Sequence, residues 1–306
     1  MGEVTELRFD GRVAVISGAG GGLGREYALL LAARGAQVVV NDLGTSRQGE
    51  GADLTMAQTV VDEIIAAGGK AVANGDSVAT ADGGTAIIDT AIASFGRIDI
   101  VIHNATINRA KPFRELSYSD FSNVLDVHLG GAFHLAKAAF PLMCDQGYGR
   151  IILTSSIAGL YGEKNIAAYC TGKAAVIGLA NALAHEGAAH NVTANCIVPS
   201  AQTRLAEGRD TSHFPPWGPE HVAPAIGWLA HEKCTASGEL FVSLAGRMAQ
   251  AFVTETRGVY QPHWTPEQIE ERLSEIGDPS QQLTFAPLPK GFGGHLEGSF
   301  DMVRSA

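Results

Sequence analysis

Three side chains in the second half of the chain have the types and spacing needed to move a proton to or from an alcohol. Tyr169 and Lys173 stand four residues apart in a helical stretch, so both project from one face. A phenol has a pKa near 10, and a neighbouring ammonium lowers it. Ser156 lies thirteen residues earlier, at the end of a β-rich run, where it could hold a substrate oxygen. Each of these patterns alone also occurs by chance in unrelated proteins. An acid–base site is therefore expected only if the rest of the chain supports it.

A glycine-rich turn near the N-terminus could hold phosphate groups. Gly18, Gly22 and Gly24 fall between an apolar run and an apolar helical stretch. Glycine lets the backbone approach a pyrophosphate, and the amides of a helix N-terminus favour its charge. Asp42, eighteen residues after Gly24, ends the next apolar run, where a carboxylate can accept hydrogen bonds from ribose hydroxyls. It would also repel the 2′-phosphate of NADP, so the pattern predicts NAD as the cofactor.

Two more polar positions follow apolar runs and are expected in the same cofactor groove. Asp76 ends the third run and could face the adenine, and Asn104 and Ala105 follow the fourth. No metal site is expected, because the ten histidines are scattered and the four cysteines form no CxxC pair. The cysteines are therefore expected to be reduced thiols.

The elements that must position these residues alternate between strand and helix. The apolar runs expected to be strands are Arg12–Ser17, Gln37–Asn41, Lys70–Ala73, Ile98–Ile102, Arg150–Thr154, Val192–Val198 and Glu239–Leu244. The expected helices between them are Gly22–Arg34, Leu54–Ala67, Ala81–Phe95, Tyr118–Met143, Ala167–Gly187 and Pro219–Ala230. Strands that are apolar throughout belong to a parallel sheet covered on both faces. The expected fold is α/β: a single Rossmann-type doubly wound sheet of about seven strands, with helices on both faces.

The strand–helix rhythm stops at about residue 249. We therefore expect a domain over residues 1–248, which carries both cofactor and catalytic residues, and a C-terminal extension over 249–306. Thr265–Ile276 is expected to be one helix, with Thr265 as N-cap and Pro266 in the first position. The remainder of the extension, rich in proline and glycine, is expected to be irregular.

Composition limits the partners and the location. The chain has 306 residues and a formal net charge of −10, which argues against nucleic acid and acidic membranes as partners. No secretory signal or membrane-length apolar stretch is visible, and the last three residues do not match a peroxisomal tripeptide. A cytoplasmic protein is expected by default.

The order and spacing of these motifs, from about residue 10 to 246, resemble the short-chain dehydrogenase/reductase family. The resemblance implies Ser156, Tyr169 and Lys173 as the catalytic triad. It also implies a set of NAD-binding positions: Gly18, Gly22, Leu23, Gly24, Asp42, Asp76, Ser77, Asn104, Ala105, Tyr169, Lys173, Pro199 and Thr203. Within the family, five segments are similar to the dehydrogenase domains of peroxisomal multifunctional β-oxidation enzymes: Val38–Gly44, Gly68–Val78, Phe95–Asp99, Tyr148–Ser156 and Val222–Cys234. That subgroup implies a 3-hydroxyacyl-CoA substrate, and some members also act on hydroxysteroids.

Three positions depart from the family pattern. His103 and Thr106 replace the first asparagine and the glycine of Asn-Asn-Ala-Gly, and His128 replaces a catalytic asparagine. The subgroup is similar in having histidine at that last position. We expect His128 to charge near pH 6.5 and to oppose proton passage from Tyr169 in acid. The alternative is that His128 packs and hydrogen-bonds a backbone carbonyl.

The resemblance and the helix patterns give the remaining expectations. The substrate is expected to be an acyl-CoA or steroid-like alcohol, bound between residues 106–114 and 203–217, where basic side chains mix with aromatic ones. Apolar residues on more than one face of two helices predict a homodimer or homotetramer. The alternatives are an NADPH-dependent 3-oxoacyl reductase and a catalytically inactive NAD-binding scaffold.

Overall fold

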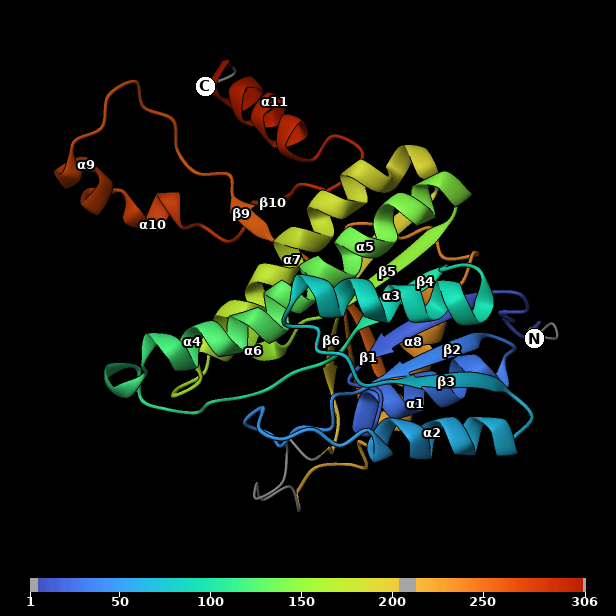
Figure 1. Ribbon diagram of the computed structural model, residues 1–306. Helices are drawn as coiled ribbons and strands as arrows, with labels where there is room; N and C mark the ends of the chain where they lie inside the picture. Colours follow the sequence, from blue (N-terminus) through green and yellow to red (C-terminus); the bar gives the residue numbers. More distant parts are fainter. Residues whose placement is uncertain (1–4, 204–212, 305–306) are drawn as a thin grey trace. The chain divides into compact units, whose positions relative to one another are not determined.

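A mostly parallel sheet forms the centre of the larger part of the chain (Figure 1). The computed structural model describes residues 5–203 and 213–304, and the sheet order is β3-β2-β1-β4-β5-β6-β7-β8. The strands are β1 Val13–Ser17, β2 Gln37–Asn41, β3 Lys70–Asn74, β4 Ile100–His103, β5 Gly149–Thr154, β6 Val192–Ser200, β7 Leu240–Leu244 and β8 Arg247–Ala251. The doubly wound α/β fold is confirmed, with β8 as one strand more than expected.

Helices cover both faces of this sheet (Figure 1). One layer holds α1 Gly22–Ala33, α2 Thr55–Ala66 and α8 Ala223–Ala230. The other holds α3 Ala81–Phe95, α4 Tyr118–Leu125, α5 Gly131–Gln146 and α7 Ala167–Gly187, and the short α6 Ile157–Tyr161 packs on α7. Short 3₁₀ turns occupy Phe113–Glu115, Ala188–His190 and Pro219–His221.

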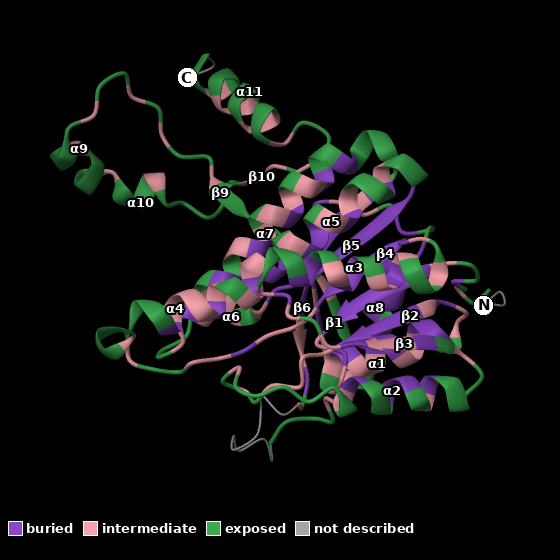
Figure 2. Ribbon diagram, viewed as in Figure 1, coloured by how far each residue is buried: buried purple, intermediate pink, exposed green. Residues whose placement is uncertain are grey.

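The core forms because the strands are apolar on both faces. All five residues of β1 are buried, and so are all four of β4. Figure 2 shows buried residues along the strands and on the inner sides of the helices. Such burial on two faces is the reason that these runs show no alternation of polar and apolar residues.

One helix differs from its sequence pattern. The stretch expected as Tyr118–Met143 is two helices, α4 and α5, joined by a π-helical turn over Asp126–Gly130. Apolar spacing continues through this turn and therefore hides it. A Cβ on Gly131 would lie 2.8 Å from Cε1 of His103, so glycine permits the close approach of the turn to β4. The turn carries His128.

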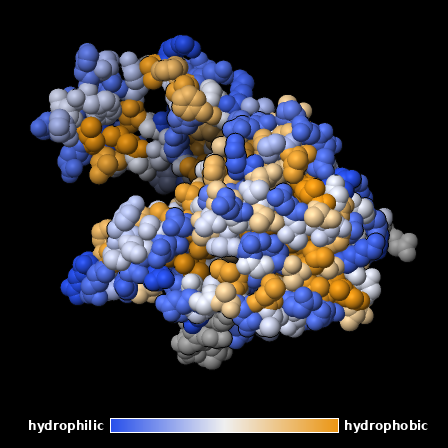
Figure 3. All heavy atoms as spheres, viewed as in Figure 1, coloured by the Kyte–Doolittle hydropathy of each residue, from blue (hydrophilic) through white to orange (hydrophobic). Residues whose placement is uncertain are grey.

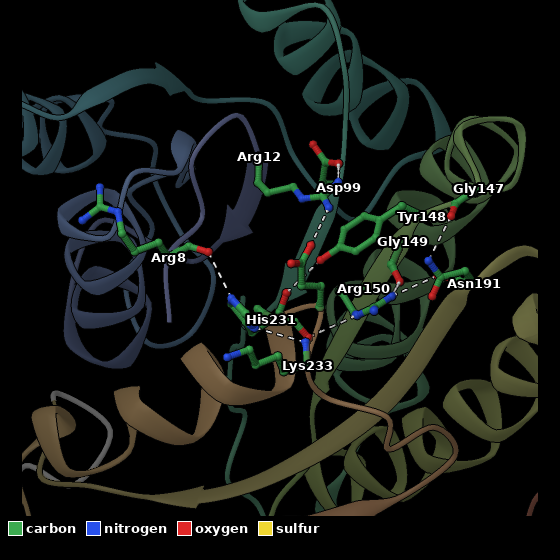
Figure 4. Close-up of polar contacts among 12 residues, drawn as sticks. Arg8, Arg12, Asp99, Gly147, Tyr148, Gly149, Arg150, Asn191, His231 and Lys233 are labelled. Atoms are coloured by element: carbon green, nitrogen blue, oxygen red, sulfur yellow. Dashed lines mark hydrogen bonds and ion pairs between the residues drawn. The ribbon is translucent and has the colours of Figure 1, made fainter. Parts of the chain in front are cut away.

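A polar cluster joins the amino ends of the strands, at the edge opposite the carboxyl ends (Figure 4). The buried Asp99 carboxylate accepts hydrogen bonds from Arg12 Nη1 at 3.0 Å and from Val13 N at 2.9 Å. The guanidinium groups of Arg12 and Arg150 lie 3.6 and 4.4 Å from the centre of the Tyr148 ring. Buried charges are stable only when they are paired in this way. The cluster therefore links the starts of β1 and β5 to the segment before β4.

The described structure divides into two compact units, Met1–Gln250 and Ala251–Ala306. In the second unit none of the described residues is buried (Figure 2). Its elements are β9 Thr254–Thr256, β10 Gln282–Thr284, α9 Pro266–Glu271, α10 Leu273–Ile276 and α11 Gly291–Arg304.

Two expectations for this unit need correction. Thr265 caps α9 as expected, but the helix breaks at Arg272. The tail after it is not irregular, because the helix α11 forms there although it contains four glycines. Its apolar residues Phe292, Leu296 and Phe300 recur every four residues and give a helical stripe that glycine content obscured.

Candidate active site

A cleft of about 920 Å³ opens at the carboxyl ends of the central strands. Its walls bring together thirteen of the predicted residues: Gly18, Gly22, Leu23, Asp42, Asp76, Ser77, Asn104, Ala105, Ser156, Tyr169, Lys173, Pro199 and Thr203. Gly24 and His128 are not on its walls. In doubly wound sheets, ligands bind at this edge, outside the carboxyl ends of the strands.

The glycine-rich turn has backbone conformations and contacts that require glycine. Gly18 has φ +65°, and a Cβ there would lie 2.8 Å from the Cα of Ala105. Gly24 lies behind the cleft, where a Cβ would overlap the carbonyl oxygen of Gly18. The turn is therefore a bare backbone cradle in front of the α1 N-terminus. It fits the pyrophosphate of a dinucleotide.

Asp42 is held in place by the backbone. Its two carboxylate oxygens accept hydrogen bonds from Gly20 N at 2.8 Å and Gly44 N at 2.7 Å. A carboxylate has about four acceptor positions, so further ones remain for ligand hydroxyls at the cleft wall. This geometry fits an adenosine ribose.

Two asparagines that the sequence analysis did not single out position Asp76. Asn41 and Asn74 are register partners at the ends of β2 and β3, and Asn41 Nδ2 donates to Asn74 Oδ1 at 2.8 Å. Asn41 Nδ2 also donates to the carbonyl of Asp76, and Asn74 Nδ2 donates to its carboxylate. The signal was present, since both strands end in a buried polar residue.

Ser156, Tyr169 and Lys173 line the same cleft as the glycine-rich turn. Ser156 caps α6, where its Oγ accepts from Ala158 N at 3.2 Å and keeps its own proton for another acceptor. Lys173 is 2% exposed, and its Nζ donates to the carbonyl of Thr154 at 2.8 Å. The same Nζ lies 5.7 Å from the centre of the Tyr169 ring. Burial lowers the pKa of Lys173 to about 7.

His128 does not have the charge expected of it. Its side chain is fully buried, and burial together with the nearby Lys173 charge holds its pKa well below 6.5. The expectation that His128 becomes charged near pH 6.5 is therefore wrong. Its ring instead packs edge-on against the Tyr169 ring, with centroids 5.1 Å apart, and its Nε2 lies 3.0 Å from the carbonyl of Ile107.

The basic residues expected at the substrate end are largely paired. Arg109 lines the cleft, but its Nη1 bonds Asp120 at 3.1 Å, and Lys111 Nζ bonds the same carboxylate at 2.7 Å. Hydrogen bonds from Lys111 and Ser117 hold the pKa of Asp120 at about 2. Exposed Arg114 pairs with Glu115. Of the other residues expected there, Arg204 and Arg209 lie outside the described residues, and Trp217 lines the cleft.

The sequence model described as short chain dehydrogenase matches residues 12–210. The chain belongs to the short-chain dehydrogenase family. Peroxisomal multifunctional enzyme type 2 of Drosophila melanogaster is 44% identical over 298 residues, covering 95% of this chain and 49% of the relative. Its full-length structure matches with a TM-score of 0.80 at 37% identity, over 97% of this chain and 51% of the other.

Two further relatives extend this comparison. The peroxisomal hydratase-dehydrogenase-epimerase of Saccharomyces cerevisiae is 45% identical over 277 residues, 89% of this chain and 31% of the relative. A 7α-hydroxysteroid dehydrogenase, in complex with NADH and 7-oxo glycochenodeoxycholic acid, has a TM-score of 0.71 and 30% identity, over 80% of this chain and 96% of the other. The chain thus spans about half or less of the multifunctional relatives. Members of this oxidoreductase family, such as the 7α-hydroxysteroid dehydrogenase above, bind a nicotinamide cofactor.

These names correct the expected location. The fly and yeast relatives are both named as peroxisomal enzymes, so the cytoplasmic expectation is wrong. That expectation rested only on the lack of a visible targeting signal. Such signals are recognised by a receptor and are not part of the folded domain. Among the described residues, no helix is both long and apolar enough to cross a membrane.

Proposed function

We propose that this protein oxidises a secondary alcohol to a ketone with NAD, using Tyr169 as the proton acceptor. The observation that carries the proposal is the buried Lys173 ammonium, fixed on Thr154 O and held 5.7 Å from the Tyr169 ring at the cofactor cleft. Burial disfavours the charge of Lys173. Such a perturbed group in a cleft is typical of a functional site.

Each catalytic residue has one role in the proposal. The Ser156 hydroxyl donates a hydrogen bond to the substrate oxygen and so holds that oxygen beside Tyr169. Tyr169 takes the hydroxyl proton, and the Lys173 charge stabilises the phenolate from which that transfer starts. When bound, the nicotinamide supplies the hydride acceptor. His128, behind the Tyr169 ring and away from the cleft wall, positions that ring and touches no reacting atom.

The choice of NAD over NADP rests on Asp42. Its carboxylate is fixed by two backbone amides at the cleft wall, so it cannot turn away from an incoming phosphate. A dianionic 2′-phosphate beside it would be repelled, while ribose hydroxyls would be bound. This also disfavours the NADPH-dependent reductase.

The proposed substrate is a 3-hydroxyacyl-CoA. The similarity to multifunctional enzymes over 95% of the chain supports it. A hydroxysteroid is the second candidate, because one structural relative was solved with an oxidised bile acid. The internal pairing of Arg109 and Lys111 with Asp120 leaves fewer free cations for the CoA phosphates than the sequence implied.

We also propose a homodimer or homotetramer formed through α5 and α7. The outer side of α7 exposes Ala174, Gly178 and Ala182, and that of α5 exposes Phe133, which is 50% exposed. In Figure 3, hydrophobic patches lie among hydrophilic side chains on the face shown. Small residues and an exposed aromatic on adjacent helices suit close packing of a second copy.

Tyr169→Phe tests the proposed function. The variant keeps the ring against His128 but loses the proton acceptor, so turnover should fall below about a tenth, while NAD affinity stays within about twofold. Tyr118→Phe, at a residue 82% exposed, is the matched control and should behave as wild type. If Tyr169→Phe keeps more than about a tenth of wild-type turnover, the assignment is wrong.

A further inference from the structure

The three positions at which this chain departs from the family pattern touch one another. His103 Nε2 lies 3.0 Å from the carbonyl oxygen of His128. Thr106 Oγ1 lies 2.7 Å from Nε2 of the same His128. His128 therefore contacts the other two positions, His103 through its backbone oxygen and Thr106 through its ring.

Hydrogen bonding fixes where the proton sits on His128. Its Nε2 lies 3.0 Å from the carbonyl of Ile107, which can only accept, so Nε2 must carry the proton. Its buried Nδ1 has no partner among the described residues, so a proton there would be left without an acceptor. His128 is thus the neutral Nε2–H form. That proton is shared between the Ile107 carbonyl and Thr106 Oγ1.

His103 is fixed in the same form. Its Nε2 donates to the His128 carbonyl, so its Nδ1 accepts the proton of Ser17 Oγ at 3.0 Å. Ser17 Oγ in turn accepts from Asn104 N and Ala105 N, at 3.1 and 3.2 Å. Burial lowers the pKa of His103 to about 3. The backbone of residues 104–107 is therefore held at one end through His103 and Ser17, and at the other by His128.

This arrangement determines the direction of the Thr106 hydroxyl proton. Because Oγ1 accepts from His128 Nε2–H, the proton of Thr106 cannot point at His128. Thr106 lines the cleft. From this geometry we infer that Thr106 donates a hydrogen bond into the cleft, to an oxygen acceptor of the bound nicotinamide nucleotide or of the alcohol substrate, and that His128 and His103 are positioning residues for it.

The donor lies on the catalytic side of the cleft. The His128 ring that bonds Thr106 also packs on the Tyr169 ring, with centroids 5.1 Å apart. An oxygen acceptor there belongs either to the nicotinamide half of the cofactor or to the substrate. The inference thus rests on the proposed function and adds a specificity residue to it.

The experiment compares Thr106→Val, which removes the hydroxyl but keeps the shape, with Thr106→Ser, which keeps the hydroxyl. Thr171→Val is the matched control, since the Thr171 hydroxyl bonds the carbonyl of Ala167 on the same helix as Tyr169. For each protein, the Kd of NADH is measured by fluorescence titration, and kcat and KM by alcohol oxidation. Imidazole nitrogens of ¹⁵N-histidine protein give the protonated atom of His128 by NMR.

We expect Thr106→Val to weaken one ligand by about three- to tenfold, and Thr106→Ser to restore it. A raised Kd of NADH assigns the acceptor to the cofactor, and a raised KM of the alcohol with unchanged Kd assigns it to the substrate. If both stay within about twofold of wild type, the inference is overturned. A His128 protonated on Nδ1 overturns it even if Thr106→Val fails to fold. The Kd of NADH would report on Thr106 even if Tyr169→Phe remained active and refuted the proposed function.

Discussion

Replacing Lys173 by methionine should make the protein more stable below neutral pH while removing its activity. Methionine fills similar space without a charge. Each pKa unit corresponds to about 1.4 kcal/mol, so the fall from 10.5 to about 7 in the fold means that burying the ammonium costs about 5 kcal/mol. The variant leaves Thr154 O without its donor, which costs about 1–3 kcal/mol. Near pH 6, where lysine is charged in both states, the net gain should be about 2–4 kcal/mol.

The sign of this effect should change with pH. Between the folded pKa of about 7 and the unfolded value of 10.5, the unfolded chain binds more protons, so wild-type stability rises with pH from this group. Near pH 10 the free energy of unfolding of wild type should be about 4 kcal/mol higher, from this group, than near pH 6. Lys173→Met should then be as stable as wild type or less stable.

Urea unfolding of both proteins at the two pH values, without ligands, gives the difference in free energy of unfolding. Lys137→Met, at an exposed lysine, is the control and should show no such change. A difference between Lys173→Met and wild type that is the same at both pH values would show that burial does not lower the pKa of Lys173.

Three further outcomes are expected. Wild type should prefer NAD over NADP by about a hundredfold or more in kcat/KM, and Asp42→Ser should reduce this preference to about tenfold or less. Equal kcat/KM for the two cofactors in wild type would contradict the role of Asp42. His128→Asn should leave the acid side of the pH profile of kcat/KM unmoved, because His128 stays neutral there; a shifted profile would show that His128 does titrate. Light scattering at micromolar concentration should give a dimer or tetramer, and Phe133→Glu should reduce its mass; a wild-type monomer would rule out the assembly.

Much of the fold and of the cleft could be predicted because many of the cleft residues directly follow a strand. Ser156, Asp42 and Asn104 each follow an apolar run, and parallel strands carry such positions to one edge. Tyr169 and Lys173 needed only the helical repeat. These are local regularities, and a single sequence carries them.

Other features depend on contacts between distant segments, which the sequence does not give. The neutrality of His128 follows from full burial beside Lys173, forty-five residues away. Asp120 pairs with both Arg109 and Lys111 only because the loop before α4 folds back on that helix. The π-helical turn keeps apolar spacing, so no break is visible. In each case the sequence shows the residue type, but contacts made only in the fold decide what the residue does.

We propose that this protein transfers hydride from a 3-hydroxyacyl-CoA to NAD. The most direct measurement is NADH formation by the purified protein with a series of 3-hydroxyacyl-CoAs of different acyl length and with hydroxysteroids, each tested with NAD and with NADP. We expect turnover with NAD on the acyl-CoA series, with kcat/KM above that for the steroids. Absence of NADH formation with every alcohol, or turnover that requires NADP, would contradict it.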